Sequence, residues 1–133
     1  MRALLFMALC LLSAPALAAG PEKGSSVEGL FVDLDPIVLP IVDGGRVTQS
    51  VTFAITLEFA GPADADRARL LKPRLADGFV TALYGMLNDA NAPKRGLVDA
   101  AEAKKRLLRK AQEILGEARV KAVLLQAVQQ RGI

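Results

Sequence analysis

The chain has 133 residues, a formal net charge of +3 and a hydrophobic fraction of 52%. Much of the apolar content lies in residues 1–19, of which 16 are apolar, so a polytopic membrane protein is excluded. There is no histidine, and the one cysteine, Cys10, lies in the same N-terminal segment. Ser-His-Asp and Cys-His catalysis, disulfide scaffolding and His/Cys metal sites are therefore excluded for the rest of the chain.

Residues 1–19 have the pattern of a signal peptide. Arg2 precedes an uninterrupted apolar run over residues 3–12, and Ala16-Leu17-Ala18 is a small-x-small cleavage pattern. A run of about ten apolar residues is typical of a signal peptide, whereas a membrane-spanning helix needs about twenty. We expect export with cleavage near Ala18. The alternative is an N-terminal anchor formed by residues 3–19. In both cases the rest of the chain lies on the far side of the membrane.

A polar linker covers residues 20–29, and β patterns follow it. Residues 30–35 form a short extended run, and Pro36 and Pro40 interrupt its continuation. Proline cannot donate a ladder hydrogen bond, so this region is an edge strand, a bulged strand or two short pieces. The Gly44-Gly45 pair then predicts a tight hairpin turn.

The clearest strand of the sequence covers residues 51–59. Apolar and polar residues alternate over its whole length, with small polar residues on one face. This period-two pattern, built from β-branched and aromatic residues, predicts a half-buried strand. The apolar face consists of Val51, Phe53, Ile55, Leu57 and Phe59.

Two helices are predicted after Gly61-Pro62. Asp64 or Asp66 is a candidate cap for the first, whose apolar residues recur at spacings of three and four over residues 71–87. Pro73 inside this pattern predicts a short lead-in helix before the main one, with Lys72 outside helical geometry.

The second helix is predicted from Asp99 to about Leu115, with an apolar stripe at Ala100/Ala103, Leu107, Ala111 and Ile114/Leu115. Asp99 and Glu102 have the spacing of a capping box, and Gly116 is a natural C-terminal stop. The last segment, residues 118–131, fits helix by propensity and strand by alternation equally well. The residues alone leave both readings open.

Charge is divided unevenly along the chain. Residues 20–66 carry eight acidic and two basic residues, whereas residues 67–133 carry six acidic and fourteen basic ones. The densest basic cluster is the candidate partner-binding site: Lys104, Lys105, Arg106, Arg109 and Lys110. It is interpreted either as a solvated helix face or as a docking surface for an acidic partner or anionic headgroups. Nucleic acid is not expected, because no aromatic residues are interleaved with the bases.

Catalysis is not expected. Asp33 and Asp35 point the same way from one predicted strand, but no third carboxylate follows at ligand spacing. Of the serines beyond residue 19, Ser25 and Ser26 lie in the linker and Ser50 begins a strand, and nothing marks any of them as a nucleophile. We expect no enzyme activity, no metal and no cofactor.

Five segments, in this order, carry a resemblance to a known family. They are Ile37–Ile41 (IVLPI), Leu57–Phe59 (LEF), Lys72–Asp77 (KPRLAD), Leu107–Lys110 (LLRK) and Val120–Gln126 (VKAVLLQ). Together they resemble the flagellar basal-body-associated protein FliL family. The resemblance covers roughly residues 30–130, nearly the whole domain.

The resemblance implies an α+β fold similar to the stomatin/prohibitin (SPFH) type. It implies a small curved antiparallel or mixed sheet packed against helices in the order β-β-α-α-β, so that the last segment is a strand. Residues 30–133 would form a periplasmic, non-catalytic domain. FliL proteins associate with the flagellar stator at the inner membrane, assemble into rings or partial rings, and support motility. The alternative function is a soluble periplasmic domain that binds anionic headgroups or another envelope protein.

Overall fold

The strand predicted by apolar alternation is the centre of the fold. In a computed structural model, which describes residues 29–92, 96–116 and 119–133, this strand is β3 (Arg46–Phe59). The side chains of its predicted apolar face are at most 2% exposed. The prediction of a half-buried strand is confirmed, although the strand begins at Arg46 rather than at Val51.

One edge of β3 pairs with two short strands. β1 (Phe31–Asp33) pairs with residues 56–58, and β2 (Ile37–Asp43) pairs with residues 46–53, both antiparallel. The proline-interrupted region is therefore two pieces, which was one of the predicted alternatives. A hairpin joins β2 to β3, and Gly44 and Gly45 have φ angles of 57° and 77°, as a tight turn of this kind requires.

The other edge of β3 pairs with the C-terminal strand β4 (Val120–Gly132). The pairing is antiparallel from Phe59↔Val120 to Gln49↔Gly132, with two bulges that place one extra residue each in β4. The segment that fitted helix and strand equally well is therefore a strand. Pairing with β3 outweighs the helix propensity of the residues of β4, because this pairing satisfies the backbone groups along one edge of β3.

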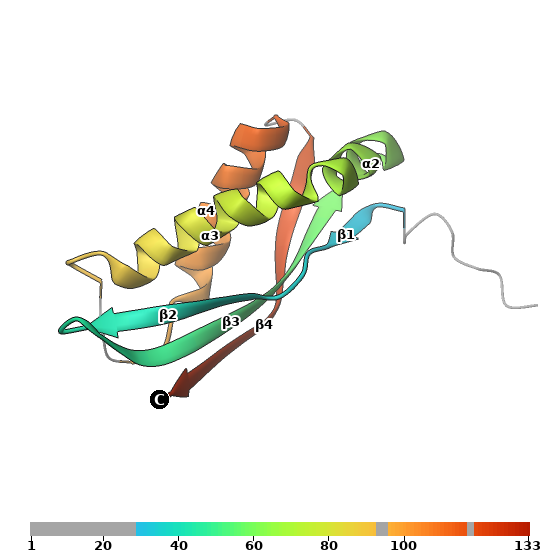
Figure 1. Cartoon of the computed structure of the whole chain (residues 1–133). Coiled ribbons are helices and arrows are strands. Elements are labelled where there is room, and N and C mark those ends of the chain that lie inside the picture. The colour runs from blue at the N-terminus through green and yellow to red at the C-terminus, as the bar shows by residue number, and fades with distance from the viewer. Residues whose placement is uncertain (1–28, 93–95, 117–118) are drawn as a thin grey trace, which may run out of the picture.

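Three helices cover one face of this sheet (Figure 1). They are α2 (Pro62–Leu70), α3 (Lys72–Asn88) and α4 (Ala100–Leu115). Among the described residues the structure is thus α+β, with a small open antiparallel sheet. The element order is β1-β2-β3-α2-α3-α4-β4. It is longer than the expected β-β-α-α-β, because the first strand is split and the lead-in helix is separate.

Two details of the first helical region differ from prediction. The N-cap of α2 is Gly61 with no side-chain cap, so neither Asp64 nor Asp66 caps this helix. Pro62 occupies the first turn, where its missing N–H costs nothing. Lys72 is the first residue of α3 rather than a residue outside it. Leu71, with φ −99° and ψ 10°, separates α2 from α3.

The helical stripes predicted from apolar spacing form the other half of the core. α3 buries Leu75, Phe79, Leu83 and Leu87, and α4 buries Ala103, Leu107, Ala111 and Leu115. Asp99 caps α4 by accepting a hydrogen bond from the Glu102 amide at 3.0 Å, and Gly116 ends it with φ 106°. The predicted bounds of this helix are confirmed, but only the Asp99 half of the expected capping box forms, because the Glu102 carboxylate accepts from Arg106 instead.

The N-terminal expectations concern residues that the structure does not describe. The signal peptide or anchor of residues 1–19 and the linker up to residue 28 lie outside the described ranges. Within those ranges, no helix combines the length and the apolar character that crossing a membrane requires.

Candidate functional site

The predicted basic cluster lies on α4, and its five residues occupy different sides of the helix. Arg106 and Lys110 lie toward α3 and are half-buried. The contact between the two helices is close here, because a β-carbon built on Gly78 of α3 would lie 3.1 Å from Cγ of Lys110 and 2.9 Å from Cδ1 of Ile114. Arg106, Lys110 and Arg109 line one groove of about 300 Å³ between α4 and Ala82 of α3.

Two of these three cations are already neutralised on their own helix. Arg106 Nε donates to Glu102 at 2.7 Å, and Lys110 Nζ donates to Glu113 at 2.7 Å. The groove therefore contains two acids and three bases, and Arg109 is the cation in it without an ion-pair partner among the described residues. Such a surface has little net field for attracting an anion into the groove.

The remaining basic residues are free of ion pairs within the described part of the chain. Lys104, Lys105 and Arg109 are all exposed. Lys104 lies one turn before Leu108, on the side of the helix away from α3. Lys105 and Arg109 lie opposite the buried stripe and are exposed to solvent, and Arg109 also lines the groove. The structure thus separates Lys104 from the other four residues.

One titrating group of α4 is perturbed. The hydrogen bond from Arg106 holds the pKa of the Glu102 carboxyl below its ordinary value, and the nearby charges of Arg106 and Lys105 act in the same direction. Glu102 therefore stays ionised as the pH falls into the range where an ordinary glutamate takes up a proton.

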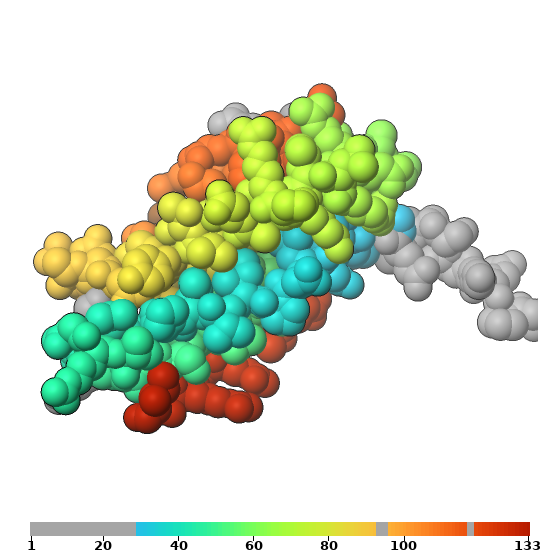
Figure 2. Space-filling model, in the orientation of Figure 1, coloured from blue at the N-terminus to red at the C-terminus, as the bar shows by residue number. Residues whose placement is uncertain are grey.

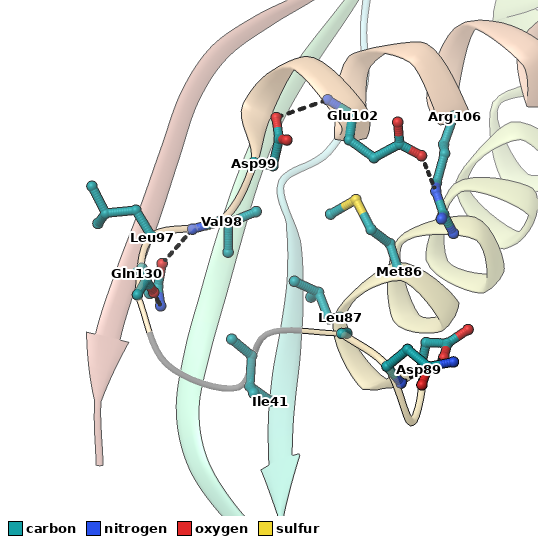
Figure 3. A pocket seen from close by; sticks show the side chains of 13 residues that line it. Ile41, Met86, Leu87, Asp89, Leu97, Val98, Asp99, Glu102, Arg106 and Gln130 are labelled. Carbon is teal, nitrogen blue, oxygen red and sulfur yellow. Dashed lines mark hydrogen bonds and ion pairs between the residues drawn. The ribbon is translucent and has the colours of Figure 1, made fainter.

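A second concavity, which the sequence did not predict, lies where α3 ends and α4 begins (Figure 3). It has a volume of about 370 Å³ and lies beside the Arg106–Glu102 pair. Apolar side chains line its wall: Ile41, Met86, Leu87, Leu97 and Val98. An apolar wall beside a neutralised ion pair suits the burial of an apolar group.

Gln130 of β4 holds one wall of this pocket in place. Its Oε1 accepts a hydrogen bond from the Val98 amide at 3.0 Å, and its Nε2 donates to the Gly96 carbonyl at 2.8 Å and to Oε1 of Gln49. The segment before α4 is thereby tied to the end of the C-terminal strand (Figure 3). No local sequence signal marks this contact, because it joins residues more than thirty positions apart.

Three of the four acidic candidates have structural partners. Asp33 accepts a hydrogen bond from Oγ1 of Thr56 at 2.6 Å, while Asp35 is exposed. Asp64 accepts from Arg119 at 2.8 Å and Asp66 pairs with Arg69 at 2.6 Å. Among the residues that the structure describes, no three metal-ligating side chains come together.

Helix side chains bond to several backbone groups along the outer edge of β1 and β2. The Asn88 amide at the end of α3 accepts from the Val42 N–H at 2.8 Å and donates to the Pro40 carbonyl at 2.9 Å. Arg69 of α2 donates to the carbonyls of Gly29 and Phe31 at 3.4 and 3.2 Å. These bonds occupy backbone groups that another strand would need.

Comparisons with known proteins do not assign this site. The sequence matches no protein-family profile, and a search against curated proteins gives no match either. The functional conclusion therefore depends on the sequence pattern and on the geometry described above.

Proposed function

We propose that this protein is a FliL-like accessory protein of the flagellar motor. It is exported, lies in the periplasm, and supports the stator at the basal body as a non-catalytic scaffold that binds motor proteins or copies of itself. Residues 30–133 form the working domain, related in fold to the stomatin/prohibitin type.

One observation carries this proposal more than any other. The C-terminal segment pairs with β3 as a strand over its whole length. The residues alone left helix and strand equally open, and only the resemblance to the FliL family implied a strand. The element order, with a long central strand followed by helices and a returning strand, also supports the proposal.

Deletion of the gene tests the proposal in cells. We expect reduced swimming speed under high viscous load with an unchanged number of filaments, because an accessory to the stator acts on torque rather than on assembly. Crosslinking in cells should recover stator components. Normal motility under load, or crosslinking that recovers no motor protein, would contradict it.

A second candidate function follows from the exposure of Lys105 and Arg109. These cations face solvent on one side of α4 and have no ion-pair partner among the described residues, so they could bind anionic headgroups. Binding of the purified protein to anionic liposomes, lost as salt is raised, would support this function. Absence of binding at low salt would exclude it.

A further inference from the structure

The two edges of the sheet differ in how their backbone groups are satisfied. Asn88 and Arg69 bond to several backbone groups of the β1–β2 edge, as described above. At the other edge, no described residue forms a hydrogen bond to the outward backbone groups of β4, which runs for 13 residues. Val120 and Val123 in the first part of β4 are buried, so the accessible part of this edge covers residues 125–132. An accessible strand edge is a template for another strand.

The hydrogen bonds of β3 identify which groups of β4 point outward. The Ile55 carbonyl accepts from the Leu34 amide at 3.0 Å, and the Phe59 amide donates to the Leu30 carbonyl at 2.8 Å, so the odd-numbered residues of β3 direct their backbone toward β1. Their partners in the β4 register direct their own backbone groups away from β3. In the accessible part of β4 these partners are Leu125, Val128, Gln130 and Gly132.

An apolar strip lies beside this free edge. Leu108 of α4 and Leu125 and Val128 of β4 pack against the core but are only partly buried. An added strand would place every second side chain on this strip. Figure 2 shows the end of β4, in red, projecting at the lower margin of the molecule.

The charge beside the edge is positive. Of the seven basic residues of α4 and β4, three form ion pairs with Glu102, Glu113 and Glu58, and Lys105 and Arg109 lie on the solvent side of α4. Lys104 lies one turn from Leu108 and has no ion-pair partner among the described residues, and Arg131 lies exposed near the end of β4. The surface therefore complements an acidic segment.

We propose that the free edge of β4 binds an extended, acidic segment of a partner protein by strand addition. Backbone groups pair with the four outward residues of β4, alternate apolar side chains cover Leu108, Leu125 and Val128, and a carboxylate pairs with Lys104. This inference deepens the proposed scaffold function, on which it rests, by naming the surface and the chemistry of the partner.

A second copy of the chain fits this edge less well. β4 contains no acidic residue, so the edge of another copy supplies no carboxylate for Lys104 or Arg131. An acidic segment supplies one.

Binding of a short peptide in which valine alternates with glutamate tests the proposal. Titrated against the full chain, this peptide should bind saturably, and added salt should weaken the binding. The same peptide with proline in place of its central valines should not bind, because it cannot complete the ladder. No binding of the first peptide at low salt, or equal binding of both, would overturn the proposal.

Two matched variants of α4 distinguish binding at the edge of β4 from general electrostatic attraction. Lys104→Glu should weaken peptide binding about fivefold, as expected for reversal of one partly exposed charge at an interface. Lys105→Glu makes the same change on the solvent side and should alter binding less than about twofold. Equal losses in the two variants would show that only net charge matters and would overturn the proposal.

A third variant removes a backbone donor at the edge. In Val128→Pro the lost N–H points away from β3, so the ladder inside the protein keeps its bonds while peptide binding should fall at least about tenfold. Circular dichroism checks that the variant is folded. If it is not, the comparison of Lys104→Glu with Lys105→Glu still decides the question.

Amide exchange locates the bound peptide. The amides of Leu125, Val128 and Gln130 should exchange rapidly in the free protein and slowly with peptide present. Protection at β2 instead, or protection that rises with protein concentration in the absence of peptide, would overturn the proposal, the latter by placing a second copy on the edge. These measurements use purified protein, so their failure is distinguishable from a normal motility phenotype of the deletion strain.

Discussion

Asn88 links a helix end to a strand edge with one side chain. Its amide forms two hydrogen bonds with the backbone of β2, at 2.8 and 2.9 Å, across 46 and 48 positions of sequence. Both backbone groups are part-buried and would lack a partner if the amide were absent. The contact therefore fixes α3 on the sheet and satisfies β2 at the same time.

Replacing Asn88 should test this contact directly. Asn88→Ala leaves a backbone donor and an acceptor unpaired, so we expect a loss of about 1–3 kcal/mol in the free energy of unfolding. Urea denaturation measures it. Asn91→Ala, an exposed position in the following turn, is the control and should change stability by less than about 0.5 kcal/mol. Equal stability of the two variants would contradict the assignment.

The ion pair of Glu102 predicts a pH dependence of stability. The Arg106 hydrogen bond lowers the pKa of Glu102 in the folded state below its value in the unfolded chain. The stabilisation is therefore complete above the unfolded pKa and disappears as the pH falls through the folded pKa. The free energies of unfolding of the wild type and of Glu102→Gln, measured by denaturation, should differ most near neutral pH and converge in acid. A difference that stays constant across this range would contradict the prediction.

At the scale of elements, the packing of α3 on α4 distinguishes two glycines of the same helix. A β-carbon at Gly85 would meet no atom within 4 Å, whereas one at Gly78 would lie 2.9 Å from Ile114. Gly85→Ala should therefore raise the free energy of unfolding by about 0.5–1 kcal/mol through helix propensity. Gly78→Ala should raise the free energy of unfolding by less, because the Ile114 side chain must move. Thermal denaturation compares the two, and a larger gain at Gly78 would contradict the close contact.

The elements that the sequence predicted well are those with a local periodic signal. The apolar face of β3 and the stripes of α3 and α4 follow from spacings of two, three and four residues, and the structure buries them as predicted. The C-terminal strand could not be assigned from its residues, because its conformation is decided by pairing with β3, more than sixty positions away throughout the register.

The candidate site was predicted only in part for a similar reason. The basic residues of α4 were found by composition, but their division between the α3 side, solvent and the β4 side depends on how the helix packs. Asn88, Arg69 and Gln130 carry no sequence signal, since each bonds to backbone groups at least 32 positions away. Polar contacts of this kind are visible only in the folded chain.

At the scale of the whole molecule, the sheet depends on its last strand. β4 supplies the buried Val120 and Val123 and pairs with β3 along most of its length. A chain that stops after Gly116 exposes an edge of β3 and one side of the core, so we expect it not to fold cooperatively. A chain that stops after Gln129 retains both valines and should fold with reduced stability. Near-UV circular dichroism distinguishes them, and a native-like spectrum for the shorter chain would contradict this view.

The closed margin formed by Asn88 and Arg69 limits how copies of this protein can be joined. Continuous growth of a sheet from molecule to molecule needs two available margins on each subunit, and here helix side chains already occupy one of them. Strand pairing at the remaining margin ends after a single partner. A ring built from many copies must therefore close through helices or loops, and the sheet of every subunit stays available for a different protein.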